Sequence, residues 1–112
     1  MLTFILKKEW FEKIEKGEKT VEYREVKPYW THRIQSAAYL GVLYSESLFL
    51  KWLESYGTQG VYTPYAPAKF CLGYTGKYLE AAIDSIAIVN GMESDLKIDK
   101  PVYAFYFHLS EN

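Results

Sequence analysis

The sequence predicts an α+β fold, a small mixed β-barrel of about five to six strands with two to three flanking helices. Three observations predict it. The chain has 112 residues, of which 49% are hydrophobic and 18% aromatic, and this is enough for one packed core in a single domain, residues 1–112. The hydrophobic period changes from helical to strand-like after Gly17. The last third of the chain alternates apolar and polar residues in three segments, as strands do.

The first predicted elements are a strand and a helix. Residues 2–6 are apolar and end at a charged run, which is typical of a short buried strand. Trp10, Phe11 and Ile14 then recur at helical spacing and predict an amphipathic helix with one buried face. Gly17 supplies the C-terminal stop of this helix.

The next segment, residues 19–24, alternates with the period of a strand. We expect Val21 and Tyr23 to join the core. The opposite face of the strand then carries a row of polar side chains: Thr20, Glu22 and Arg24.

The middle of the chain predicts two more helices. A short helix over residues 29–36 follows a proline, and a longer one over 45–56 has an apolar stripe and ends at Gly57. Residues 37–44 are compatible with a strand or a helix. Residues 58–67 contain two clusters of Gly and Pro and predict a loop.

The last third predicts three strands and two turns. The strands cover residues 68–74, 78–89 and 102–109, in which apolar and polar residues alternate or aromatic residues dominate. Turns are expected at Gly76 and at Asn90-Gly91.

The composition points to a binding face and excludes some classes of protein. Eleven Tyr, six Phe and three Trp exceed what so small a core holds, so several rings should lie at the surface. A net charge of −1 argues against binding of duplex nucleic acid mainly by phosphate neutralisation. Up to Arg33, however, eight Lys and Arg stand against six Asp and Glu, which permits a local basic patch.

The chain lacks the usual signs of disulfides, metals, cofactors and membranes. Its one cysteine, Cys71, allows no internal disulfide and suggests a reducing compartment. His32 and His108 have no ligand-type neighbours at metal-site spacing, so we expect no metal and no cofactor. No apolar run approaches the length of a membrane span. We therefore expect a cytoplasmic protein.

The polar row next to Lys19 is the main candidate site. A Glu and an Arg two residues apart on one strand face can pair, which fixes the direction of the carboxylate. If Lys19 reaches the same point, Lys19, Glu22 and Arg24 together can read a base edge, hold a phosphate or move a proton. The alternative is a solvated strand with structural ion pairs.

The segment from Phe4 to Trp30 resembles the opening of the ASCH family, in the PUA-like superfamily. A strand and an amphipathic helix lead there to the signature Gly-x-Lys-Thr-hydrophobic-Glu-x-Arg. The matching residues are Gly17, Lys19, Thr20, Val21, Glu22 and Arg24. Residues 68–110 resemble the family's later strands, whereas 39–67 have no counterpart and are expected to form a helical insertion.

This resemblance implies a PUA-like β-barrel with a cleft near the signature, in a superfamily associated mainly with RNA. It also implies that a carboxylate on the long strand, Glu80, points toward the cleft. Other family members are small amidohydrolases that act on acylated cytidine, and nuclease activity has been suggested for some. The amidohydrolases place a catalytic Lys at the position of Lys19 and a nucleophilic Thr three residues later, where this chain has Glu22.

Aromatic and basic residues flank the signature. Tyr23, Tyr29 and Trp30 are candidates to stack on unpaired bases. Lys27 and Arg33 are candidates for phosphate contacts from the short helix. Core packing of the rings and solvation of the charges are the alternatives.

Three hypotheses follow. The first is a domain that binds RNA or a nucleotide-like ligand through Lys19, Glu22 and Arg24. The second is a small hydrolase of a modified nucleoside, with Lys19 and Glu22 as the proton-handling pair. The third is a protein-interaction module in which the charges are only structural.

Overall fold

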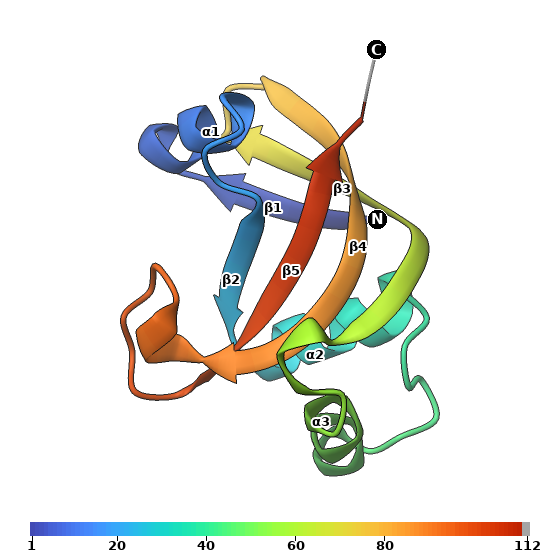
Figure 1. Cartoon of the computed structure of the whole chain (residues 1–112). Coiled ribbons are helices and arrows are strands. Elements are labelled where there is room, and N and C mark those ends of the chain that lie inside the picture. The colour runs from blue at the N-terminus through green and yellow to red at the C-terminus, as the bar shows by residue number, and fades with distance from the viewer. Residues whose placement is uncertain (111–112) are drawn as a thin grey trace.

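A computed structural model describes residues 1–110 and has an α+β fold, in which one curled five-stranded sheet packs against three α-helices (Figure 1). The strand order is β1-β3-β4-β5-β2, so β1 and β2 form the two edges of the sheet. The strands are β1 (Leu2–Leu6), β2 (Val21–Glu25), β3 (Val61–Leu72), β4 (Tyr78–Asn90) and β5 (Pro101–Leu109). The helices are α1 (Lys8–Glu15), α2 (Pro28–Ala37) and α3 (Glu46–Glu54), with the short 3-10 turns η1 (Gly57–Gln59) and η2 (Gly91–Glu93).

The two long strands give the sheet its curl. β1 runs parallel to β3, and all other neighbouring strands are antiparallel. The register shifts between Tyr62 and Ala66 in β3 and between Ile83 and Ser85 in β4. Such irregularities bend a strand and increase its twist. The sheet therefore curves into an incomplete barrel, which agrees with the predicted barrel-like fold.

Aromatic side chains fill the concave side of this sheet. Phe4 of β1 stacks on Phe70 of β3, with ring centroids 5.1 Å apart, and meets Phe105 of β5 edge-on at 5.0 Å. Offset and edge-on pairs of this kind are favourable beyond the area that they bury. The helices add further buried residues to the core: Phe11 and Ile14 from α1, Ile34 from α2, and Phe49 and Leu53 from α3.

Local sequence signals set the helix ends. Gly17 follows α1 with a φ of 79°, a conformation that glycine adopts without strain. Pro28 occupies the first turn of α2, where its missing N–H costs nothing. The Ser45 hydroxyl accepts a hydrogen bond from the Leu48 N–H and caps α3.

Two predictions for the middle of the chain were wrong. Residues 39–44 form neither strand nor helix but an irregular connection between α2 and α3, since Tyr39 and Gly41 both adopt positive φ values. Residues 58–67 are mostly strand, because β3 begins at Val61. Pro64 lies within the register shift of β3, where a missing N–H breaks no regular pairing. The expected insertion, residues 39–67, thus comprises this connection, α3, η1 and the first half of β3.

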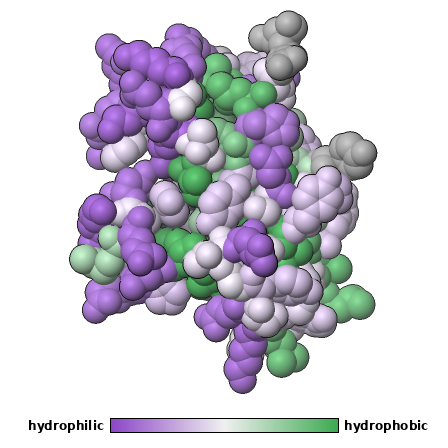
Figure 2. All heavy atoms as spheres, viewed as in Figure 1, coloured by the Kyte–Doolittle hydropathy of each residue, from purple (hydrophilic) through white to green (hydrophobic). Residues whose placement is uncertain are grey.

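Figure 2 shows that hydrophilic and hydrophobic residues gather on different parts of the surface. Hydrophilic residues gather at the upper left, where α1 lies, and hydrophobic ones appear at the lower right, near the connection from α2 to α3. Tyr39 and Leu43 of this connection are 84% and 94% exposed. No helix in residues 1–110 is both long enough and apolar enough to cross a membrane.

Candidate functional site

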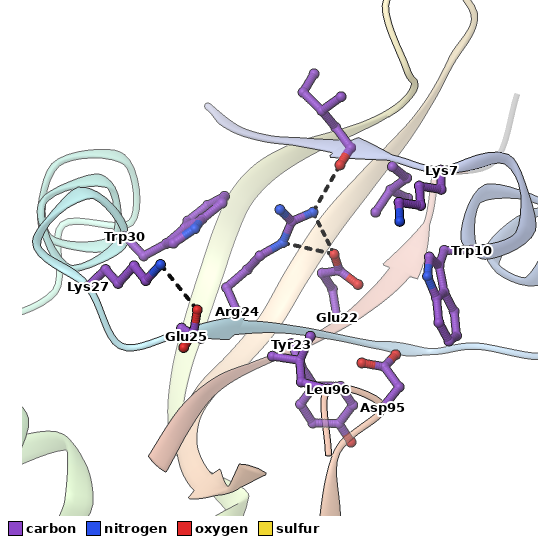
Figure 3. A pocket seen from close by; sticks show the side chains of 12 residues that line it. Lys7, Trp10, Glu22, Tyr23, Arg24, Glu25, Lys27, Trp30, Asp95 and Leu96 are labelled. Atoms are coloured by element: carbon purple, nitrogen blue, oxygen red, sulfur yellow. Dashed lines mark hydrogen bonds and ion pairs between the residues drawn. The ribbon is translucent and has the colours of Figure 1, made fainter. Parts of the chain in front are cut away.

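A cleft of about 390 Å³ lies between the two edges of the sheet (Figure 3). One wall is the end of β1 with Lys7, and the other is β2 from Glu22 to Glu25. Trp10 of α1 and Trp30 of α2 lie at opposite ends, and Asp95 and Leu96 come from the connection between β4 and β5. The cleft thus occupies the place where the barrel does not close.

Glu22 lies inside this opening and not on a solvated face. Its residue is only 5% exposed, while Val21 and Tyr23 on the opposite face are partly exposed. The predicted faces of β2 are therefore reversed. The reason is compensation of charge, because Arg24 and Lys19 both contact the Glu22 carboxylate, and a buried charge is tolerated when it is paired and hydrogen-bonded.

Arg24 joins the two edges of the sheet. Its Nε and Nη2 donate to Glu22 Oε2 at 3.0 and 2.7 Å, and Nη2 also donates to the backbone oxygen of Ile5 in β1 at 3.2 Å. The guanidinium lies over the Trp30 ring at 5.2 Å and over the Phe4 ring at 5.4 Å. Its Nη1 group has no hydrogen-bond partner among residues 1–110.

Lys19 lies in a cage of two carboxylates and two rings. Its Nζ is 3.3 Å from Glu22 Oε1 and forms a second ion pair with Asp95. The same ammonium lies 5.4 Å from the centre of the Trp10 ring and 5.2 Å from that of Tyr23. The side chain is only 9% exposed. Lys19 therefore holds the β4–β5 connection, through Asp95, against the start of β2.

Lys7, Lys27 and the Tyr23 hydroxyl also contribute to the electrostatics of the cleft. Lys27 pairs with Glu25 at 3.1 Å at the Trp30 end, and Lys7 has no ion-pair partner in the described part of the chain. Burial raises the pKa of the Tyr23 hydroxyl, and the Asp95 carboxylate raises it further. Tyr23 therefore keeps its proton well above neutral pH and remains a hydrogen-bond donor.

The structure brings most of the predicted residues together. Glu22, Tyr23, Arg24, Lys27 and Trp30 line the cleft. Lys19 and Thr20 line an adjoining hollow, and Lys19 contacts the cleft through Glu22.

Three predicted residues do not reach the cleft. Arg33 points away and donates from Nη2 to the Met1 backbone oxygen at 2.6 Å. Glu80 is exposed and lies opposite Lys69 in the register of β3 and β4, and β4 is two strands away from the β2 edge. Tyr29 is 62% exposed and meets Trp30 only edge-on.

Other residues of the cleft were missed. Trp10 was assigned to the core, yet it is half-buried and lines the opening. Asp95 lies in a connection without periodicity. Nothing in the local pattern indicates its contact with Lys19, which lies 76 residues earlier in the chain. The expected surplus of surface rings is present, but exposed tyrosines such as Tyr62 and Tyr74 are scattered and do not line the cleft.

The residue types that line the cleft define its chemistry. Serine, threonine and cysteine are missing among the cleft-lining residues of the described chain, so these residues offer no aliphatic hydroxyl or thiol nucleophile. Within residues 1–110 no group of three His, Cys, Asp or Glu side chains is placed to bind a metal ion. The cleft offers instead aromatic surface, a free guanidinium edge, lysines and fixed carboxylates.

Comparisons of the chain with protein-family models, with curated proteins and with solved structures found no match. The geometry of the cleft is therefore the basis for a functional proposal.

Proposed function

We propose that this protein binds single-stranded RNA or a nucleotide-like ligand in the cleft between β1 and β2. One observation carries the proposal. The Arg24 guanidinium is held by Glu22 and stacked near Trp30, while its Nη1 group remains without a partner in residues 1–110. A guanidinium fixed in this way can donate two hydrogen bonds to a phosphate or a base without losing freedom on binding.

The size and lining of the cleft support the proposal. About 390 Å³ lies within the range of small-molecule sites. Trp10 and Trp30 supply apolar surface at its two ends, and stacking of a base on an aromatic ring contributes roughly 1–3 kcal/mol. Lys7 and Lys27 can contact phosphates at the rim.

We further propose that the domain is of the ASCH type with a PUA-like fold. The Gly-x-Lys-Thr-hydrophobic-Glu-x-Arg signature from Gly17 to Arg24 supports this assignment. So does the position of Glu22 and Arg24 in a cleft of a curled sheet. RNA is the ligand that this superfamily implies.

A hydrolase of modified nucleosides is the second candidate. The 3.3 Å contact between Lys19 and Glu22 favours it, because the two side chains are close enough to exchange a proton. Both groups are already engaged by other charges, Lys19 by Asp95 and Glu22 by Arg24. Water activated by Glu22 would have to replace the threonine nucleophile of the amidohydrolases.

The test is a binding assay with matched variants. The purified protein is titrated with short single-stranded RNAs, mononucleotides and acylated cytidine, and every mixture is analysed for products. We expect binding that Arg24→Gln and Trp30→Leu weaken at least about tenfold. Arg33→Gln, at the only other arginine of the chain, and Trp52→Leu in α3 serve as controls and should bind normally.

The other outcomes decide between the alternatives. Release of acid and cytidine that is lost in Lys19→Ala would assign the hydrolase. Absence of binding and turnover with all ligands would overturn both, and would leave a protein-interaction module as the better account. Circular dichroism of each variant shows whether the fold is kept.

A further inference from the structure

A second hollow adjoins the cleft at the start of β2. Its volume is about 270 Å³, and its lining includes Lys13 of α1 and Glu18 of the connection from α1 to β2. Three residues line both hollows: Trp10, Tyr23 and Asp95. Figure 3 shows Trp10 at the end of the cleft opposite Trp30, and Tyr23 and Asp95 side by side across the β2 ribbon from Glu22 and Arg24. The two hollows therefore form neighbouring parts of one groove that passes around the edge strand β2, from its Glu22 face to its Val21 face.

The shared boundary is suited to a nucleic-acid strand. The rings of Trp10 and Tyr23 flank the Lys19 ammonium at 5.4 and 5.2 Å. Aromatic surfaces next to a fixed cation are the usual means by which proteins hold successive bases and the phosphate between them. A single nucleotide in the cleft would leave the second hollow empty.

Cations lie at both ends of the groove. Lys27 lies at the Trp30 end. At the other end the Lys13 ammonium lies 5.0 Å from the centre of the Trp10 ring and has no ion-pair partner in residues 1–110. β2 from Val21 to Glu25 takes four extended steps and spans ~13 Å, which exceeds the ~3.4 Å that one nucleotide of a stacked strand spans.

We infer that the ligand is an oligonucleotide whose neighbouring residues occupy the two hollows, and that Lys13 contacts its backbone in the second one. This inference rests on the proposed function. It assigns Lys13, outside the signature, as a determinant of ligand length.

The test compares ligands of increasing length. Affinities for a mononucleotide, a dinucleotide and a tetranucleotide of single-stranded RNA are measured with the wild-type protein and with Lys13→Gln. We expect the tetranucleotide to bind at least about tenfold more tightly than the mononucleotide. Lys13→Gln should reduce tetranucleotide affinity about three- to tenfold and leave mononucleotide affinity unchanged.

Controls separate the two proposals. Lys16→Gln removes an exposed lysine that lines neither hollow and should have no effect. Binding that does not increase with length, or that Lys13→Gln weakens equally for all lengths, overturns the oligonucleotide inference while the proposed function stands. Failure of every nucleotide and RNA to bind overturns both.

Discussion

The Glu22 carboxylate is the buried charge on which the cleft depends. Its Oε2 accepts two hydrogen bonds from Arg24, and its Oε1 contacts the Lys19 ammonium. The Arg24 side chain is one-quarter exposed, and the Lys19 side chain is nearly buried. An ionic cluster of this kind adds little net stability compared with an apolar core, but removal of one partner leaves the other charges uncompensated. Its role is therefore to fix the Arg24 guanidinium in place.

Replacement of this carboxylate should destabilise the fold. Glu22→Gln leaves Lys19 and Arg24 facing a neutral amide, and we expect a loss of about 2–3 kcal/mol in the free energy of unfolding, measured by urea denaturation. Glu25→Gln is the control, since the pair that Glu25 forms with Lys27 is largely solvated and should contribute less than about 1 kcal/mol. Equal losses in the two variants would contradict a special role for Glu22.

Tyr103 makes folding sensitive to alkaline pH. This residue is fully buried and shares a 2.5 Å hydrogen bond with the Thr31 hydroxyl. Burial raises its pKa to about 12, from 10.0 in the unfolded chain. The folded state thus retains the phenolic proton at a pH at which the unfolded state has lost it.

The sign of the effect follows from linkage. The contribution of the Tyr103 proton to stability is complete below pH 10 and is lost between pH 10 and about 12, by about 1.4 kcal/mol per pH unit. We expect Tyr103→Phe to be less stable at pH 8, because the Thr31 hydroxyl loses its partner, and to decline less steeply above pH 10. Urea denaturation of both proteins from pH 8 to 11.5 measures this difference. Parallel curves would contradict the assignment.

At the scale of elements, the connection from β4 to β5 positions one side of the cleft. η2 begins where the Asn90 side chain accepts from the Met92 N–H, and the Ser94 hydroxyl donates to the Gly91 backbone oxygen at 2.7 Å. Gly91 is buried against the segment that leads into β5. A Cβ atom there would lie 2.5 Å from the backbone oxygens of both Ile98 and Lys100.

Gly91→Ala should therefore displace this connection. We expect a loss of about 1–3 kcal/mol in stability from overpacking. We also expect weaker ligand binding, because Asp95 and Leu96 line the cleft. Urea denaturation and RNA titration measure the two effects. As a control, Met92→Ala changes an exposed side chain of the same turn and should alter the free energy of unfolding by less than about 0.5 kcal/mol. Equal losses of stability in Gly91→Ala and Met92→Ala would argue against a steric clash at Gly91.

At the scale of the whole molecule, the charge balance limits how the protein can hold RNA. The net charge is −1, so no general attraction for a polyanion exists and the basic residues act only where they gather. In the cleft these are Lys7, Arg24 and Lys27. Affinity should come mainly from stacking and hydrogen bonds.

This balance predicts a weak dependence on salt. With two to three phosphate contacts, log K for single-stranded RNA should fall against log salt concentration with a slope of about −1 to −2. Titration of a tetranucleotide from 50 to 300 mM salt measures the slope. A slope beyond about −4 would show that other lysines of the surface neutralise the backbone and that the cleft is not the main site.

The sequence by itself determined the elements whose pattern is local. The spacing of Trp10, Phe11 and Ile14 predicted α1 correctly, and Gly17 correctly predicted its end. The alternation of residues in β5 also predicted a strand correctly. Periodicity and glycine conformation act within a few residues, so the sequence alone reveals them. Glu22 and Arg24 also form the pair that their spacing on the strand allowed.

Only the tertiary structure decided which face of β2 turns inward and which residues meet. Strand alternation defines two faces but does not say which one is buried. The burial of Glu22 depends on Arg24, on Lys19 and, through Lys19, on Asp95 from a distant connection. The same holds for Glu80, which the strand order places away from the cleft. Charge compensation and strand order involve residues far apart in the chain, and local patterns carry no information about them.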